Sequence, residues 1–206
     1  FCFMCRHVCT VALTTNEEEM SPRSKSLMLS MILRGSTEYS IDISESIYQC
    51  CLCGYCRMWC EGGWDFMKAA VAARKDLVEK GILPSQIDAI IKRLRKHGSL
   101  FIDKPIMNEF HNNHEENNSE NNVLLVFGDA AANGDPLIGQ SAIKILERTG
   151  IRPRTLKLED EGGFYLYFLG DVDEGIKRIK AFFEAVKKIE CEKIVVVSPD
   201  LYFLLK

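Results

Sequence analysis

Apolar residues recur at helical spacing through the first half of the chain. Ser21 followed by Pro22 is a typical helix start, and the apolar positions that follow end at Gly35. The same periodicity continues beyond this glycine. It predicts further helices around Ile47, over 65–81 and over 84–98. We expect the apolar faces of these helices to form the core of a helical domain.

The hydrophobic pattern changes after residue 122. Residues 123–127 (VLLVF) are a short, continuous apolar run, which is typical of a buried parallel strand. The remaining pattern predicts strands at 154–158 and 193–198, with helices at 136–149 and 172–189. Strands that alternate with helices predict right-handed crossovers and a parallel sheet. The predicted fold class is therefore α+β, a helical domain followed by a small parallel βαβαβ unit, with a further helix expected to begin near Lys206.

Two glycine-containing segments are predicted to be turns. The first, GDAAANGDP (128–136), joins a strand to a helix and could bind phosphate through backbone N–H groups. Asp129 and Asp135 would repel that anion, and neither a dinucleotide-binding nor a Walker pattern is present, so we expect an ordinary turn. The second turn, Glu161-Gly162-Gly163, precedes a strand-like segment, FYLYFL.

An Asn- and Glu-rich stretch divides the chain. Residues 108–122 contain almost no apolar side chain and cannot bury enough surface to fold. We interpret them as a polar linker between a domain at 1–107 and a domain at 123–206. His111 and His114 are interpreted as solvated linker residues rather than metal ligands.

Composition narrows the range of functions. The 206 residues carry a net charge of −3 and are 47% hydrophobic. The chain therefore lacks the excess of basic residues that would indicate nucleic acid binding. No apolar run reaches the roughly 18–20 residues of a membrane span, and no secretion signal is recognisable. We expect a cytoplasmic protein, or one that a partner holds at the inner face of a membrane.

Cysteine spacing carries the strongest chemical signal. Eight of the nine cysteines lie within residues 1–60. The run CCLCGYCRMWC has the C-x2-C-x2-C-x3-C spacing that ferredoxins use for a cubane iron–sulfur cluster, and FCFMCRHVC repeats that motif without its first cysteine. The candidate ligands of two [4Fe-4S] clusters are therefore Cys50, Cys53, Cys56 and Cys60, with Cys2, Cys5 and Cys9.

Disulfides and zinc are the alternatives for such a group of cysteines. The rest of the chain has no cysteine network of the kind found in disulfide scaffolds. Zinc sites usually combine two C-x2-C pairs at a finger-like separation. Here the cysteines of each motif instead follow one another at steps of three residues and then one step of four. The pattern favours iron–sulfur clusters over both.

In two-cluster ferredoxins the last cysteine of each motif ligates the other cluster. On that template Cys9 joins Cys50, Cys53 and Cys56, and Cys60 joins Cys2 and Cys5. The second set lacks a fourth ligand, which would fall two residues before Phe1. Cys51, His7 and a three-iron cluster are the alternatives, although Cys51 and Cys191 are interpreted as buried thiols and His7 as a hydrogen-bonding residue.

The order of these parts resembles the cysteine-rich iron–sulfur proteins around heterodisulfide reductase, a group that includes the iron–sulfur subunits of glycolate oxidase and of anaerobic glycerol-3-phosphate dehydrogenase. The resemblance covers nearly the whole chain. It rests on CFMCRHVC with the following SPRSKSLML, CCLCGYCRMWC, NVLLVFGDAA, LEDEGGFYLYFLG and KIVVVSPDLYF.

The sequence departs from that family where its members carry further cysteines. Asp129, Glu161-Gly162-Gly163 and Leu201 occupy those places, so we expect no cluster and no disulfide chemistry in the C-terminal unit. Thr10 and Glu61 stand where proline commonly follows the last cysteine of each motif, a minor departure.

The resemblance implies a non-catalytic electron-transfer subunit of an oxidoreductase complex. Its partners would be a flavoprotein dehydrogenase subunit and other redox subunits, so a hetero-oligomer is expected. A catalytic subunit like the heterodisulfide reductases, and a structural adaptor stabilised by its clusters, are the alternatives. The missing cysteines argue against the catalytic alternative.

Overall fold

The computed structural model describes residues 2–101, 122–155 and 162–206. Two compact units are distinguished: Phe1–Ala89 with Tyr167–Val172, and Ile90–Leu166 with Asp173–Lys206. Helices predominate and the strands form a three-stranded parallel sheet, which confirms the α+β class. Apart from Asn122, the predicted linker and its two histidines lie outside the described residues.

The first unit is helical, and its longer helices were predicted from the sequence. Ser21 caps α3, accepting a hydrogen bond from the Ser24 backbone N–H at 3.2 Å, as the Ser-Pro start predicts. Asp65 caps α6 in the same way, and Gly81 ends it in a left-handed conformation. The elements are α1 (Met4–His7), α2 (Thr10–Thr15), the 3₁₀ helix η1 (Glu18–Met20), α3 (Pro22–Leu33), α4 (Ile41–Tyr48), α5 (Tyr55–Met58) and α6 (Phe66–Lys80).

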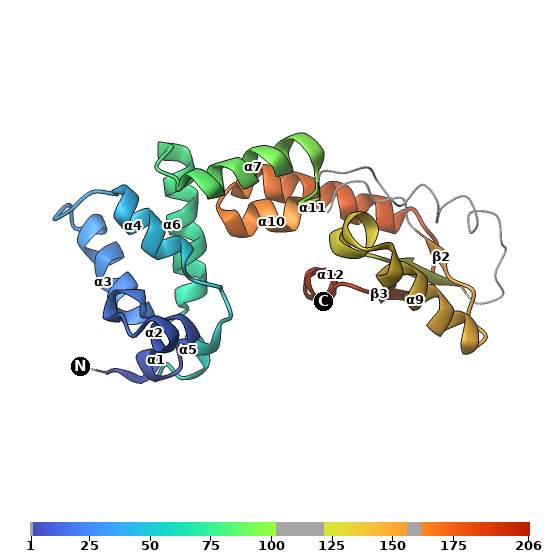
Figure 1. Ribbon diagram of the computed structural model, residues 1–206, viewed down its shortest axis with the longest axis horizontal. Helices are drawn as coiled ribbons and strands as arrows, with labels where there is room; N and C mark the ends of the chain where they lie inside the picture. Colours follow the sequence, from blue (N-terminus) through green and yellow to red (C-terminus); the bar gives the residue numbers. More distant parts are fainter. Residues whose placement is uncertain (1, 102–121, 156–161) are drawn as a thin grey trace. The chain divides into compact units, whose positions relative to one another are not determined.

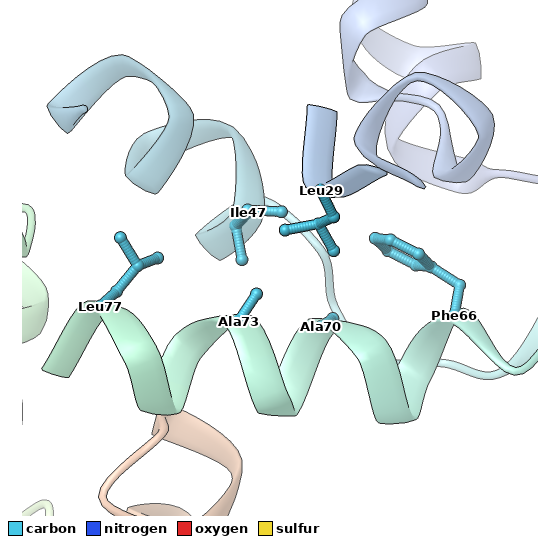
Figure 2. Close-up of a cluster of buried hydrophobic side chains, with 6 residues drawn as sticks. All are labelled: Leu29, Ile47, Phe66, Ala70, Ala73 and Leu77. Atoms are coloured by element: carbon cyan, nitrogen blue, oxygen red, sulfur yellow. The ribbon is translucent and has the colours of Figure 1, made fainter. Parts of the chain in front are cut away.

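The core of this unit lies between α3, α4 and α6 (Figures 1 and 2). Figure 2 shows one face of α6 directed at Leu29 of α3 and Ile47 of α4. The contributing α6 positions follow one another at steps of four, three and four, the spacing of a single helical face; they are Phe66, Ala70, Ala73 and Leu77. The predicted apolar stripe of α6 is therefore confirmed as core.

The second unit contains the sheet. Apart from α10, its elements follow the predicted order, and α7, α10 and α11 each include residues of both units: α7 (Ser85–His97), β1 (Val123–Val126), the π-helical turn η2 (Ala130–Gly134), α9 (Pro136–Arg148), β2 (Arg154–Thr155), α10 (Gly162–Leu169), α11 (Val172–Lys187), β3 (Lys193–Val196) and α12 (Pro199–Leu205). A helix was expected to begin near Lys206, whereas the helix that follows β3, α12, begins at Pro199. The remainder of the second predicted strand, 156–158, lies outside the described residues.

The strand-like interpretation of FYLYFL is wrong, because this segment belongs to the helix α10. A short run that is apolar throughout has no periodicity to separate a buried strand from a buried helix. Gly163, predicted to lie in a turn, is inside this helix, where a Cβ atom would lie 2.8 Å from the Arg178 Cβ atom of α11. Glycine therefore allows close packing of two helices here.

The sheet has the order β2-β1-β3, with parallel pairing throughout. Leu125 and Phe127 pack with α9 residues on one face, while Leu124 and Val126 pack with α11 and α12 residues on the other. Because both faces of β1 are covered, every residue of this strand is buried. This explains the continuous apolar run seen in the sequence.

No helix in the described ranges has both the length and the apolar character needed to cross a bilayer.

Candidate metal centre

Two short helices carry the cysteine motifs. Cys5 lies in α1, and Cys2 and Cys9 lie on either side of it. Cys56 lies in α5, which has Cys53 before it and Cys60 after it. The helices α1 and α5 contact each other, so the fold brings the two motifs together although about fifty residues separate them. All nine cysteines are free thiols.

The first cavity between these motifs, called the Cys9 cavity below, groups Cys9 with the central motif. Its volume is about 20 Å³, about the space of one water molecule. An iron–sulfur cluster is larger than this space, so its binding would require the lining residues to move. The cavity is lined by Cys9, Cys50, Cys51, Cys53 and Cys56, together with Lys25, Phe66 and neighbouring residues.

The second cavity, called the Cys5 cavity, is larger, at about 200 Å³. Its cysteines are Cys2, Cys5, Cys60 and Cys56, the last of which also lines the Cys9 cavity. The structure thus places Cys9 with the central motif and Cys60 with the N-terminal one. This is the grouping that crossed ligation would require, although the ligand roles themselves remain predictions.

Backbone N–H groups are directed at several of the sulfur atoms. The Trp64 N–H donates to the Cys60 Sγ atom at 3.4 Å. The Leu52 N–H faces the Cys50 sulfur, and this hydrogen bond favours the thiolate. Leu52 has a φ of 54°, a left-handed conformation that is rare for a branched side chain, and the next but one residue, Gly54, has a φ of 73°. These two left-handed residues turn the backbone between Cys50 and Cys56.

Burial nevertheless favours the protonated form of these thiols. It raises the pKa of Cys50, and it raises that of Cys56 to about 11, with further contributions from the neighbouring Cys50 and Cys53. Burial also raises the pKa of Cys5, to which Cys60 and Cys2 add. Metal binding requires thiolates, so occupation of this site would release protons.

Two cations are buried beside the Cys9 cavity. Lys25, on α3, is only 1% exposed and lines the cavity. Burial lowers its pKa, while nearby Cys50 and Cys9 act in the opposite direction. Arg74, on α6, is 5% exposed and donates to the backbone carbonyl of Cys50, where the central motif begins. In the described part of the chain, neither cation forms an ion pair with a carboxylate.

Neither cation was predicted from the sequence, although helical periodicity contained a signal for each. Lys25 precedes the buried Leu29 by four residues, and Arg74 follows the buried Ala70 by four. Positions four apart lie on the same face of a helix. A charged residue in register with a predicted apolar face therefore indicates a buried charge that needs a partner.

The alternative ligands are placed as follows. The interpretation of Cys51 as a buried thiol is wrong, because its side chain is exposed; it lines the Cys9 cavity, and its Sγ atom lies 3.9 Å from the Thr10 hydroxyl. His7 is exposed and lines neither cavity. Cys191 belongs to the second unit, where it packs against the apolar cluster around Leu124. In the described residues, no three His, Cys, Asp or Glu side chains converge on a point as a single metal ion would require.

The positions where a cysteine was expected from the resemblance have structural roles in the second unit. Asp129, 2% exposed, accepts hydrogen bonds from the Ser99 hydroxyl at 2.6 Å, the Leu100 N–H at 2.8 Å and the Asn133 amide at 2.8 Å. Leu201 is buried against the sheet. Glu161 lies outside the described residues.

Comparison with protein-family models, with curated proteins and with solved structures finds no match for this chain. The resemblance to the iron–sulfur proteins around heterodisulfide reductase therefore stays a hypothesis that rests on the motifs themselves.

Proposed function

We propose that the first unit binds two iron–sulfur clusters and that the chain is an electron-transfer subunit of an oxidoreductase complex. The observation that carries this proposal is the grouping of thiols around two adjacent cavities, Cys9 with the central motif and Cys60 with the N-terminal one. A bound cluster of this type would supply one-electron redox chemistry.

The residues around the cavities fit such clusters in donor type. Thiolates are the usual ligands of iron–sulfur clusters, and N–H groups directed at the sulfurs, such as that of Trp64, tune their potential. In the Cys9 cavity the ligands would be Cys9, Cys50, Cys53 and Cys56. In the Cys5 cavity they would be Cys2, Cys5 and Cys60, so that cluster takes a fourth ligand from outside this set or contains three irons.

The surrounding unit would position the clusters and limit their access to water. Phe66 lines both cavities and is 1% exposed, and the Cys50 and Cys56 side chains pack against the same core. Exclusion of water is one of the means by which proteins set cluster potentials. Two cavities that share Cys56 would hold their clusters close enough for electrons to pass between them.

In this proposal the chain works in the cytoplasm with a flavoprotein dehydrogenase as electron donor, and other redox subunits accept the electrons. The second unit would contribute to assembly rather than to redox chemistry. Its buried Asp129 and Leu201 replace thiols that a catalytic heterodisulfide reductase-like subunit would use. The catalytic role therefore has less support than the electron-transfer role.

The deciding experiment measures iron and acid-labile sulfide in anaerobically purified protein, with EPR spectra of oxidised and reduced samples. About eight irons per chain and two interacting signals after reduction would support two [4Fe-4S] clusters. About seven irons, with a signal in the oxidised state, would indicate a three-iron cluster in the Cys5 cavity. Zinc without iron would overturn the proposal.

A further inference from the structure

The two cavities differ in the charge beside them. Lys25 lines the Cys9 cavity at 1% exposure, together with Cys50 and Cys9. Arg74 adds a second buried cation at the start of the central motif, where it donates to the carbonyl of Cys50. A buried charge is costly unless an opposite charge compensates it. Neither cation has a carboxylate partner among the described residues, so the ligand thiolates of an occupied Cys9 cavity would be the anions available to Lys25 and Arg74.

The cation beside the Cys5 cavity has a different environment. Arg23 lines that cavity, but its side chain is 32% exposed and its Nη1 atom lies 3.7 Å from a carboxylate oxygen of Glu18. Its guanidinium also lies over the Phe3 ring, 4.5 Å from the ring centroid. Solvent and the carboxylate therefore screen this charge, whereas the charge of Lys25 is screened much less.

We propose that Lys25, with Arg74 behind it, gives the cluster of the Cys9 cavity the higher reduction potential of the two. This inference rests on the proposed function. Reduction adds one electron and therefore one negative charge to a cluster, without breaking or forming a bond. A fixed positive charge in a buried site stabilises that added charge. Lys25 would not be a ligand of the cluster. It would be a positioning residue, because its charge would determine which of the two clusters takes up the first electron.

The consequence is a direction for electron flow within the chain. Electrons that a flavoprotein donor delivers to the cluster of Cys2, Cys5 and Cys60 would pass on to the cluster beside Lys25. The one-electron-reduced protein would carry its electron at the Cys9 cavity.

The test is an anaerobic redox titration of the full chain, followed by EPR. Lys25→Gln should lower the equilibrium constant for reduction of the cluster in the Cys9 cavity at least tenfold. For a one-electron couple this lowers the reduction potential by about 59 mV. The reduction potential of the other cluster should not change. Lys25→Arg, which keeps the charge, should restore the potential of the cluster in the Cys9 cavity. Lys80→Gln removes an exposed lysine at the opposite end of α6 from Phe66 and should shift neither couple. Equal shifts of both couples, or none, would overturn the proposal.

A second measurement keeps Lys25 unchanged. Cys60→Ser removes a ligand of the Cys5 cavity, and the single couple that remains should coincide with the higher couple of the unaltered protein. Coincidence with the lower couple would overturn the proposal even if Lys25→Gln failed to fold. The absence of iron from the unaltered protein would instead refute the proposed function, and with it this inference, so the two failures are distinguishable.

Discussion

Arg74 donates a hydrogen bond to the backbone carbonyl of Cys50, the first residue of the C-x2-C-x2-C-x3-C motif. The same guanidinium donates to the Phe168 carbonyl at 2.8 Å, and at 3.4 Å to the carbonyls of Ile47 and Tyr48 at the end of α4. It also lies over the Tyr48 ring, 4.9 Å from the centroid. One buried side chain of α6 therefore connects the cysteine loop to two other segments of the first unit, the end of α4 and the segment around Phe168.

Replacement of Arg74 by Met should destabilise the first unit. The substitution keeps apolar volume but leaves buried carbonyl groups without a donor, at a cost of about 3 kcal/mol. Urea denaturation followed by circular dichroism measures the loss. Lys80→Met, at the exposed end of the same helix, should change the unfolding free energy by less than about 0.5 kcal/mol. Equal stabilities of the two variants would show that the Arg74 contacts do not contribute.

Gly170 is required by a close backbone contact. Its φ is +100°, and a Cβ atom there would lie 2.4 Å from the carbonyl oxygen of Arg74. Gly170→Ala should therefore cost well above the roughly 1–2 kcal/mol of a left-handed residue alone. Gly81→Ala is the matched control, since Gly81 has a φ of +67° and nothing within 4 Å of the added atom. The midpoint of thermal unfolding should be clearly lower for Gly170→Ala than for Gly81→Ala. The reverse order of the two midpoints would contradict the close contact at Gly170.

Cys53→Ser should remove one cluster from the protein under the proposed ligand assignment. Crossed ligation links the two motifs, so the variant should also become less stable around the remaining cluster. Iron and sulfide analysis, together with denaturation under anaerobic conditions, measures both effects. Cys191→Ser is the control because Cys191 packs in the second unit, and it should keep the full iron content. Retention of both clusters by Cys53→Ser would show that the ligand assignment is wrong.

Much of the fold could be predicted because local patterns determine it. The Ser21 cap, the apolar face of α6 and the doubly buried strand β1 each leave a signal within a few neighbouring residues. The FYLYFL segment could not be predicted, because the choice of helix depends on packing between Gly163 and α11, which is not a local signal.

The candidate site shows the same division. The motif spacing is local and identified seven cysteines, and the structure groups them around two cavities. The roles of Arg74 and Asp129 depend on partners distant in the chain. Arg74 binds the Phe168 carbonyl 94 residues away, and Asp129 binds Ser99 from 30 residues away. From the sequence, Asp129 was interpreted as a residue that repels phosphate and that replaces a thiol, whereas the structure shows a buried hydrogen-bond acceptor.

Ser99→Ala should destabilise the second unit. The Ser99 hydroxyl donates to the buried Asp129 carboxylate at 2.6 Å and accepts from the Phe101 N–H at 2.9 Å. Loss of a hydrogen bond to a buried charged group costs about 2 kcal/mol. Guanidinium denaturation measures the effect, with Ser141→Ala on the exposed side of α9 as the control. Indistinguishable midpoints for the two variants would mean that the Asp129 network contributes little to stability.

The last prediction concerns the pH dependence of stability. Glu174, in the first turn of α11, accepts a hydrogen bond from the Arg178 Nε atom at 2.8 Å, and this bond, with a smaller contribution from Lys177, lowers its pKa. Arg178 in turn donates to the Leu94 and Arg95 carbonyls at the end of α7. Protonation of Glu174 would therefore weaken a contact between two helices of the second unit.

The sign follows from the lowered pKa. A carboxylate with a folded-state pKa below its unfolded value stabilises the protein above the unfolded value, about 4.3 for glutamate. That stabilisation is lost as the pH falls through the folded-state value. Because the pair is partly exposed, Glu174→Gln should cost only about 0.5 kcal/mol at pH 7. The difference from the unaltered protein should shrink as the pH falls below about 4.3.

Denaturation curves of both proteins at a series of pH values measure this difference. Glu184→Gln is the control, since Glu184 and its partner Lys187 are both exposed, at 66% and 70%, and such pairs contribute little. A difference for Glu174→Gln that is as large at pH 3 as at pH 7 would show that its effect does not depend on the charge. In that case Glu174 would support the contact between α7 and α11 through hydrogen bonding or packing, and not through its charge.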